Sequence, residues 1–207
     1  MNYQLFTEKL KKHIEYRLDQ SMIKITDLVL EELISFAFAD SGQIHLYESG
    51  SHKKGSDIST DDEDFSVKSS KNENGKMKIS SFRLTRFGDD LSSMVNFIDN
   101  DGKNFDNYLV LSRNETADKI SYSFYILPSS IFTASNMEWV AKTGKKGDKK
   151  GQITGWQTIN NENVSLSISK SMSSQLWIEI KTDFIKDYLS FEVTRELSNL
   201  GKNRFVA

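Results

Sequence analysis

Residues 52–71 read HKKGSDISTDDEDFSVKSSK, and they contain the strongest signal in the sequence for fold and function. Asp57 follows a glycine turn at the start of a short expected strand. The FSVK segment at residues 65–68 alternates apolar and polar residues, as a further strand does. Ser66 and Lys68 therefore share one strand face, and the two apolar residues take the other. A hairpin of this length is expected to bring Asp57 beside Lys68.

A carboxylate next to a lysine is useful for hydrolysing a phosphodiester. The reaction needs a hard cation such as Mg²⁺, which takes oxygen ligands and keeps several waters. Asp57 is the expected bridging ligand, with the backbone carbonyl of Val67 as a second. Lys68 would orient or help deprotonate the attacking water and stabilise the anionic transition state.

The SD…SVK pattern resembles the PD-(D/E)xK nuclease superfamily, and in particular its type II restriction endonucleases. The resemblance covers about residues 22–135, where a helix, three strands carrying Asp and Lys, a helix and two strands are expected in that order. It implies an α/β fold with a restriction-endonuclease-like core, a mixed central β-sheet flanked by helices. It also implies Mg²⁺ as the cofactor and double-stranded DNA as the partner.

One position departs from the superfamily's pattern. In that pattern an acidic residue usually lies two positions before the lysine, but this chain has Ser66 there. A second carboxylate must therefore come from another part of the chain. Glu73 is too near and lies in an expected turn. Glu31, as a metal ligand, and Glu32, as a catalytic group, are the best substitutes on the second expected helix, and both could reach metal through water.

Two other interpretations stay open. Asp57 also fits a turn residue, and Lys68 fits a solvated strand lysine. Glu179 and Lys181 form a second ExK pattern within LWIEIK. That pattern has no well-placed upstream aspartate, because the nearest is Asp148 in a lysine loop, and a cross-strand surface ion pair explains it better.

Hydrophobic periodicity extends the prediction to the rest of the chain. Helices are expected at residues 3–19, 22–38, 89–98 and 183–197, with a helical turn at 129–134. Strands are expected at residues 43–47, 57–59, 65–68, 107–112, 120–127, 164–169 and 176–180, and a polar turn at 71–75. Residues 77–87 fit either an extended segment or the approach to a helix. A single domain over residues 1–207 with a β-rich C-terminal part, about 136–207, is the simplest account.

Several segments are candidates for contact with DNA. The loop KTGKKGDKKG at residues 142–151 carries five lysines against one aspartate, so it is suited to tracking phosphates. Arg is suited to bidentate contact with phosphate or guanine, and Asn and Gln to contact with adenine. The candidates are His52, Lys53, Lys54, Arg83, Arg86, Lys145, Lys146, Lys149, Lys150, Asn160, Asn161 and Gln175. For any one of the Asn and Gln side chains, and for His52, a plain structural role is the simpler interpretation.

Composition narrows the classes of protein. The 207 residues include no cysteine, which excludes disulfides and thiolate metal sites. No apolar run approaches the ~20 residues of a membrane span, and no signal-peptide pattern opens the chain, so a cytoplasmic location is expected. The net charge of −2 does not mark a nucleic-acid binder, although a local basic stripe suffices for that role.

The leading hypothesis is a type II restriction endonuclease that cuts duplex DNA at a short specific sequence. A palindromic site favours a homodimer, and a monomer that cuts each strand in turn is the alternative. A repair or junction nuclease of the same superfamily is the second hypothesis. A non-catalytic DNA-binding or interaction domain is the third.

Overall fold

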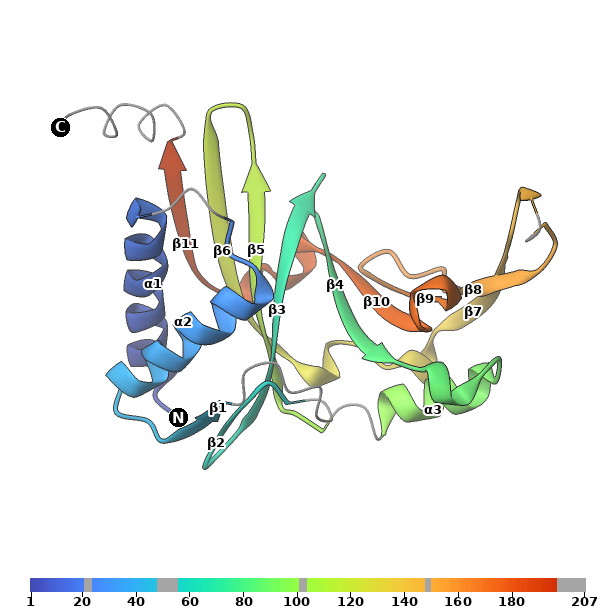
Figure 1. Ribbon diagram of the computed structural model, residues 1–207, viewed down its shortest axis with the longest axis horizontal. Helices are drawn as coiled ribbons and strands as arrows, with labels where there is room; N and C mark the ends of the chain where they lie inside the picture. The colour runs from blue at the N-terminus through green and yellow to red at the C-terminus, as the bar shows by residue number, and fades with distance from the viewer. Residues whose placement is uncertain (21–23, 48–55, 101–103, 148–149, 197–207) are drawn as a thin grey trace.

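The computed structural model describes residues 1–20, 24–47, 56–100, 104–147 and 150–196 (Figure 1). It is an α/β structure in which helices pack on a large mixed β-sheet. Within the described residues, no helix is both long and apolar enough to cross a membrane.

Two N-terminal helices cover one face of the sheet. Helix α1 (Tyr3–Gln20) repeats apolar residues at four-residue spacing, and this stripe is buried. Helix α2 (Asp27–Asp40) packs against α1 and against strand β3. Aromatic rings join the layers, since the ring of Phe38 lies 4.4 Å from that of Phe6 and 5.6 Å from that of Phe65. The stacked apolar faces hold α2 beside the strand that carries Lys68.

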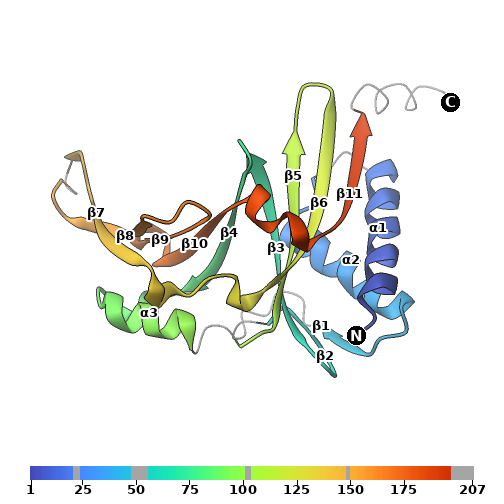
Figure 2. The same cartoon turned by 180° about the vertical axis from the view of Figure 1, so that it is seen from behind.

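The sheet runs in the order β11-β6-β5-β3-β4-β10-β9-β8-β7, with β1 and β2 attached beside β3. Its strands are β1 (His45–Tyr47), β2 (Ile58–Thr60), β3 (Asp64–Glu73), β4 (Lys76–Arg83), β5 (Asn107–Glu115), β6 (Lys119–Pro128), β7 (Glu138–Thr143), β8 (Ile153–Ile159), β9 (Val164–Ser169), β10 (Gln175–Lys181) and β11 (Leu189–Glu196). Strands β3 and β5 are parallel, and the other pairs are antiparallel. Figure 2 shows the order from behind.

Strands β3 and β4 form a hairpin whose arms separate. Asn74 and Gly75 turn the chain with positive φ angles of 54° and 73°. Pairing between the two strands is confined to Asn72 with Met77 and Glu73 with Lys76. Beyond that point the two strands diverge, as Figure 1 shows. Lys68 therefore lies on a part of β3 to which β4 is not paired.

A second core fills the other side of the sheet. Helix α3 (Leu91–Asp99) begins at Asp90, whose side chain accepts a hydrogen bond from the Ser93 N–H, as an N-terminal cap does. Its buried Met94 and Ile98 belong to the same apolar cluster as residues of β4, β5, β9 and β10. The cluster ties the C-terminal strands to the strands of the site.

Most predicted elements are confirmed, with changed bounds. The helix expected from residue 22 begins at Asp27, because Thr26 is extended and occupies the cap position. The polar turn shrinks to two residues, because β3 continues to Glu73. Residues 77–87, for which the sequence allowed two structures, form most of strand β4 followed by the 3₁₀ turn η1 (Thr85–Phe87). The expected turn near Pro128 is two short 3₁₀ turns, η2 (Ser129–Ile131) and η3 (Ala134–Asn136).

The closing helix predicted at residues 183–197 is wrong. The segment is instead a 3₁₀ helix, η6 (Thr182–Tyr188), followed by strand β11. Strand β11 pairs with β6, and its Phe191 stacks on Phe124 with ring centres 5.2 Å apart. Pairing with a sheet edge and burial of one face favour the strand over the local helical pattern.

Candidate active site around Asp57 and Lys68

Asp57 is held at the start of a short hairpin. Its backbone N–H donates to the Phe65 carbonyl over 2.7 Å, and the next residue, Ile58, pairs with Phe65. Just before it, the Ser56 hydroxyl donates to the Ile58 carbonyl over 3.1 Å. Strand β2 begins at Ile58, so no residue of β2 pairs with β3 beyond Phe65. The Asp57 side chain, in place of a strand backbone, accepts the next hydrogen bond from β3.

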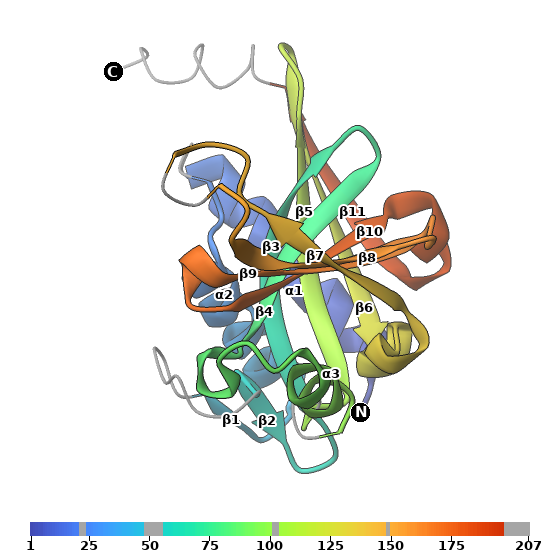
Figure 3. The same cartoon turned by 90° about the vertical axis from the view of Figure 1, so that its right-hand side faces the viewer.

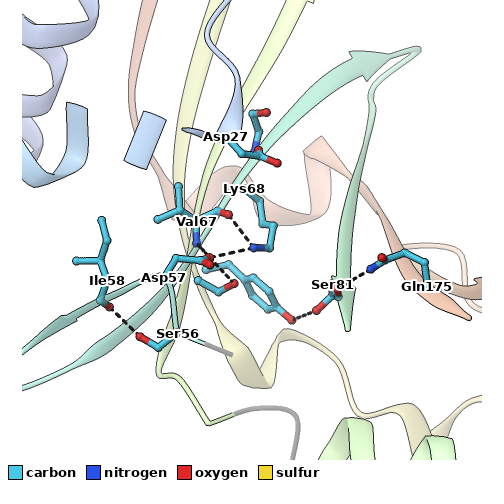
Figure 4. Close-up of polar contacts among 11 residues, drawn as sticks. Asp27, Ser56, Asp57, Ile58, Val67, Lys68, Ser81 and Gln175 are labelled. Atoms are coloured by element: carbon cyan, nitrogen blue, oxygen red, sulfur yellow. Dashed lines mark hydrogen bonds and ion pairs between the residues drawn. The ribbon is translucent and has the colours of Figure 1, made fainter. Parts of the chain in front are cut away.

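Three consecutive residues of β3 donate to one oxygen of Asp57 (Figure 4). Asp57 Oδ2 accepts from the Ser66 hydroxyl at 3.2 Å, from the Val67 N–H at 2.7 Å and from Lys68 Nζ at 3.0 Å. Within the described residues, Asp57 Oδ1 receives no hydrogen bond. The carboxylate is thus fixed in orientation and keeps one oxygen available.

Lys68 joins two oxygens that were predicted to bind metal. Its ammonium donates to Asp57 Oδ2 and, over 2.8 Å, to the Val67 carbonyl. The side chains are 17% exposed for Lys68 and 25% for Asp57, so solvent screens their attraction less than on an open surface. The prediction that a hairpin brings Asp57 beside Lys68 is therefore confirmed.

Helix α2 brings further carboxylates to this cluster. The Asp27 carboxylate accepts a hydrogen bond from the Ser69 N–H, which fixes the first turn of α2 against β3. Glu31 lies one turn further along the helix. Burial, together with the negative charge of Asp57, raises the pKa of Glu31 to about 7, although Lys68 opposes the shift. Glu31 is therefore close enough to respond to both central residues of the site.

Glu31 and Glu32 differ in their surroundings. Glu31 is half-buried, whereas Glu32 is exposed. Adjacent residues on a helix point about 100° apart, so one of the pair faces β3 and the other does not. Of the two predicted substitutes, Glu31 is the one that the structure brings to the site.

The donor chemistry fits a hard cation. Asp57 and Glu31 would supply carboxylates and Val67 a carbonyl, the oxygen ligands that Mg²⁺ takes in proteins. The Lys68 ammonium already bridges two of these oxygens, which shows that a positive group is accommodated there. Over the part of the chain that the structure describes, no three His, Asp or Glu side chains gather into a metal-binding group. Waters would have to complete the coordination.

A scan against protein-family models and searches of curated proteins and solved structures found no match to this chain.

The predicted DNA contacts have different outcomes. His52, Lys53, Lys54 and Lys149 lie outside the described residues. Lys145, Lys146 and Lys150 are exposed on the connection between β7 and β8, and Arg83 is exposed at the end of β4. The Arg86 guanidinium lies 4.3 Å from the ring centre of Phe97 and 4.7 Å from that of Phe87, so it packs on aromatic surface.

The three predicted amide side chains have structural roles. Asn160 donates to Glu138 over 2.8 Å, and Asn161 accepts from the N–H groups of Asn163 and Val164 in a turn. Gln175 donates to the Ser81 carbonyl, which links β10 to β4. These contacts favour the structural interpretation of all three.

Glu179 forms a surface ion pair, as the simpler interpretation of its ExK pattern predicts. Its carboxylate lies 2.8 Å from Lys76 Nζ, across the β10–β4 pairing. Asp148 lies outside the described residues.

Sequence reasoning missed Asp27. The signal was present, because Thr26-Asp27 before the apolar run LVLEELI is a usual start for a helix. The contact between Asp27 and Ser69, however, depends on how α2 packs on β3, and a local sequence pattern does not predict that packing.

The raised pKa of Glu31 leads to a stability prediction. Its pKa is about 7 in the folded protein against an ordinary value of 4.5, so folding disfavours the ionised form. The stability that this group contributes is full below pH 4.5 and is lost as the pH rises through 7. In EDTA, Glu31→Gln is expected to melt a few degrees above wild type at pH 8 and to lose that advantage at pH 4.5, measured by circular dichroism.

Glu32→Gln is the matched control for this measurement, because Glu32 is the exposed neighbour on the same helix. It should follow the wild-type melting temperature at every pH. A Glu31→Gln variant that did the same would contradict the proximity of Glu31 to Asp57.

Proposed function

We propose that this protein is a Mg²⁺-dependent endonuclease that hydrolyses phosphodiester bonds in duplex DNA. The observation that carries the proposal is the contact of Lys68 Nζ with both Asp57 Oδ2 and the Val67 carbonyl. A fixed carboxylate, a carbonyl and an ammonium group at one point are the groups that such hydrolysis needs. The resemblance of SD…SVK to type II restriction endonucleases supports the same activity.

Each residue has a defined task in this proposal. Asp57 and Val67 hold the ion, and Glu31 supplies a second carboxylate, directly or through water. The ion, when bound, neutralises charge on the scissile phosphate. Lys68 donates to the attacking water or to a phosphate oxygen. Ser66 is only 4% exposed, so it orients Asp57 through its hydroxyl and does not touch substrate.

The basic loop between β7 and β8 supports DNA as the substrate. Lys145, Lys146 and Lys150 are exposed there. Figure 3 shows the tip of this hairpin and helix α2 extending to the same side of the molecule. Figure 1 shows the loop and α2 at opposite ends of the long axis, so a duplex that contacted both would have to run along that axis. Cutting at one short palindromic sequence, by a homodimer, is the form of the activity that we propose.

Incubation of the protein with plasmid and phage DNA in Mg²⁺ tests the proposal. Discrete fragments that require Mg²⁺ are expected, and EDTA should suppress them. A smear would point to a non-specific or repair nuclease. Intact DNA that is retarded on a gel would point to a binding module, and intact DNA with no retardation would contradict the proposal altogether.

The lysine loop should bind phosphates in a salt-dependent way. Replacing Lys145, Lys146 and Lys150 together by alanine is expected to weaken duplex binding at low salt. The slope of log affinity against log salt should become shallower by about 0.9 for each phosphate that the loop no longer neutralises. Binding in EDTA across a range of salt concentrations measures this slope.

Lys186→Ala, at an exposed lysine of η6, is the control. An unchanged slope in the triple variant would show that the loop does not touch DNA.

A further inference from the structure

A polar hollow lies on the C-terminal part of the sheet, away from Asp57. It has a volume of about 240 Å³. It is lined by Lys78 of β4, Trp177 and Glu179 of β10, Ser165, Leu166 and Ser167 of β9, Gln157 and Thr158 of β8, and Lys142 of β7. The alternate residues of these strands, such as Ile168 and Ile178, are buried in the core. The hollow therefore lies on the face of the sheet that the core leaves open.

Strand register explains why the surface is hollow here. Ser167 lies between Trp177 on one side and Gln157 on the other, and Ser165 lies beside Glu179. Directly opposed side chains on neighbouring strands lie about 5 Å apart, so two short serines leave space between longer neighbours. The shape follows from sequence and pairing, and it does not need a loop to form it.

The hollow carries positive charge at its rim. Glu179 is neutralised by Lys76, whose Nζ lies 2.8 Å from the carboxylate. In the part of the chain that the structure describes, neither Lys78 nor Lys142 forms an ion pair. Two ammonium groups on opposite sides of a serine floor suit an anionic ligand.

Trp177 offers an aromatic surface at the same place. Its side chain is partly exposed, and Lys78 Nζ lies 5.0 Å from the centre of its ring. The ring face is thus reachable by a group outside the core. Every nucleobase has a π face that can stack on such a ring, and a phosphate could draw the Lys78 ammonium from the ring to itself.

We propose that this hollow binds one nucleotide. The base stacks on Trp177, Lys78 and Lys142 pair with the phosphate, and Gln157 with the serine hydroxyls hydrogen-bonds the base or the sugar. Ligand pockets for drug-sized molecules measure roughly 300–1,000 Å³, so this smaller space suits one nucleotide unit. The ligand is either a free mononucleotide or an unpaired nucleotide of a DNA strand. This inference does not depend on the proposed nuclease activity.

Calorimetric titration in EDTA, where no cleavage can occur, tests the inference. The probes are thymidine monophosphate, thymidine, inorganic phosphate and a short single-stranded oligothymidylate. Binding of the monophosphate, with thymidine and phosphate each weaker, is expected for a free nucleotide. Binding of the oligonucleotide alone would assign the hollow to a strand. No binding of either would overturn the proposal.

Variants assign the binding to the hollow. Trp177→Leu and the double variant Lys78→Gln, Lys142→Gln are each expected to lower affinity about tenfold. Ser167→Leu fills the floor of the hollow and keeps both charges, so it should exclude the ligand and abolish binding. Lys186→Gln is the control and should bind as wild type does. Circular dichroism checks folding, and folded hollow variants with wild-type affinity would overturn the proposal.

Discussion

Asp57→Asn should lower the rate of DNA cleavage by about 10³-fold or more while most duplex binding persists. Asparagine keeps the size of the side chain, and its carbonyl oxygen can still accept from the Val67 N–H. It lacks the negative charge that would hold the cation, and it removes the counter-ion of Lys68. Single-turnover cleavage in Mg²⁺ measures the rate, and a gel shift in EDTA measures binding.

Glu32→Gln is the matched control for this variant, because it removes an exposed carboxylate from the neighbouring helix. It should cut at the wild-type rate. If Asp57→Asn also cut at that rate, the reaction would lie elsewhere in the chain, and Glu179 with Lys181 would be tested next.

Lys68→Met should slow cleavage by about 10²-fold or more through a different route. Methionine keeps most of the apolar stem but removes the ammonium that contacts Asp57 and Val67. Because this ammonium competes with a cation for both oxygens, the Mg²⁺ concentration for half-maximal rate should stay the same or fall. In Asp57→Asn that concentration should rise. Rates measured across a Mg²⁺ series separate the two roles.

Lys71→Met is the control for Lys68, since Lys71 is an exposed lysine on the same strand and pairs with Glu73 at 2.7 Å. It should leave both the rate and the Mg²⁺ dependence unchanged. A Lys68→Met variant with wild-type cleavage would remove the ammonium group from the proposed chemistry.

The centre of the site could be predicted because its geometry is local. Asp57 and Lys68 are separated by one short hairpin, and the alternation of FSVK determines which side chains face the aspartate. The choice between Glu31 and Glu32 could not be predicted in this way. Both lie on one helix, and only the docking of α2 on β3, fixed in part by Asp27 and Ser69, decides which of them faces the site.

Long-range pairing also explains the errors in the fold. The sequence of β11 contains good helix formers, and its strand form depends on pairing with β6. The sequence of β4 fits two structures because its main partner, β10, lies far along the chain. By contrast, β5 and β6 are joined by a short connection and rich in aromatic and β-branched residues, so their local sequence already indicates strands.

The position of β11 has a consequence for biosynthesis. Phe191 and Val193 close the apolar layer that α1 and α2 form with the sheet, yet they are translated long after both helices. A nascent chain on the ribosome can pair β3 with β5 while this layer is still open to water. The apolar support behind β3, the strand that carries Lys68, is therefore complete only when synthesis has passed β11, and we expect the proposed activity to appear only after that point.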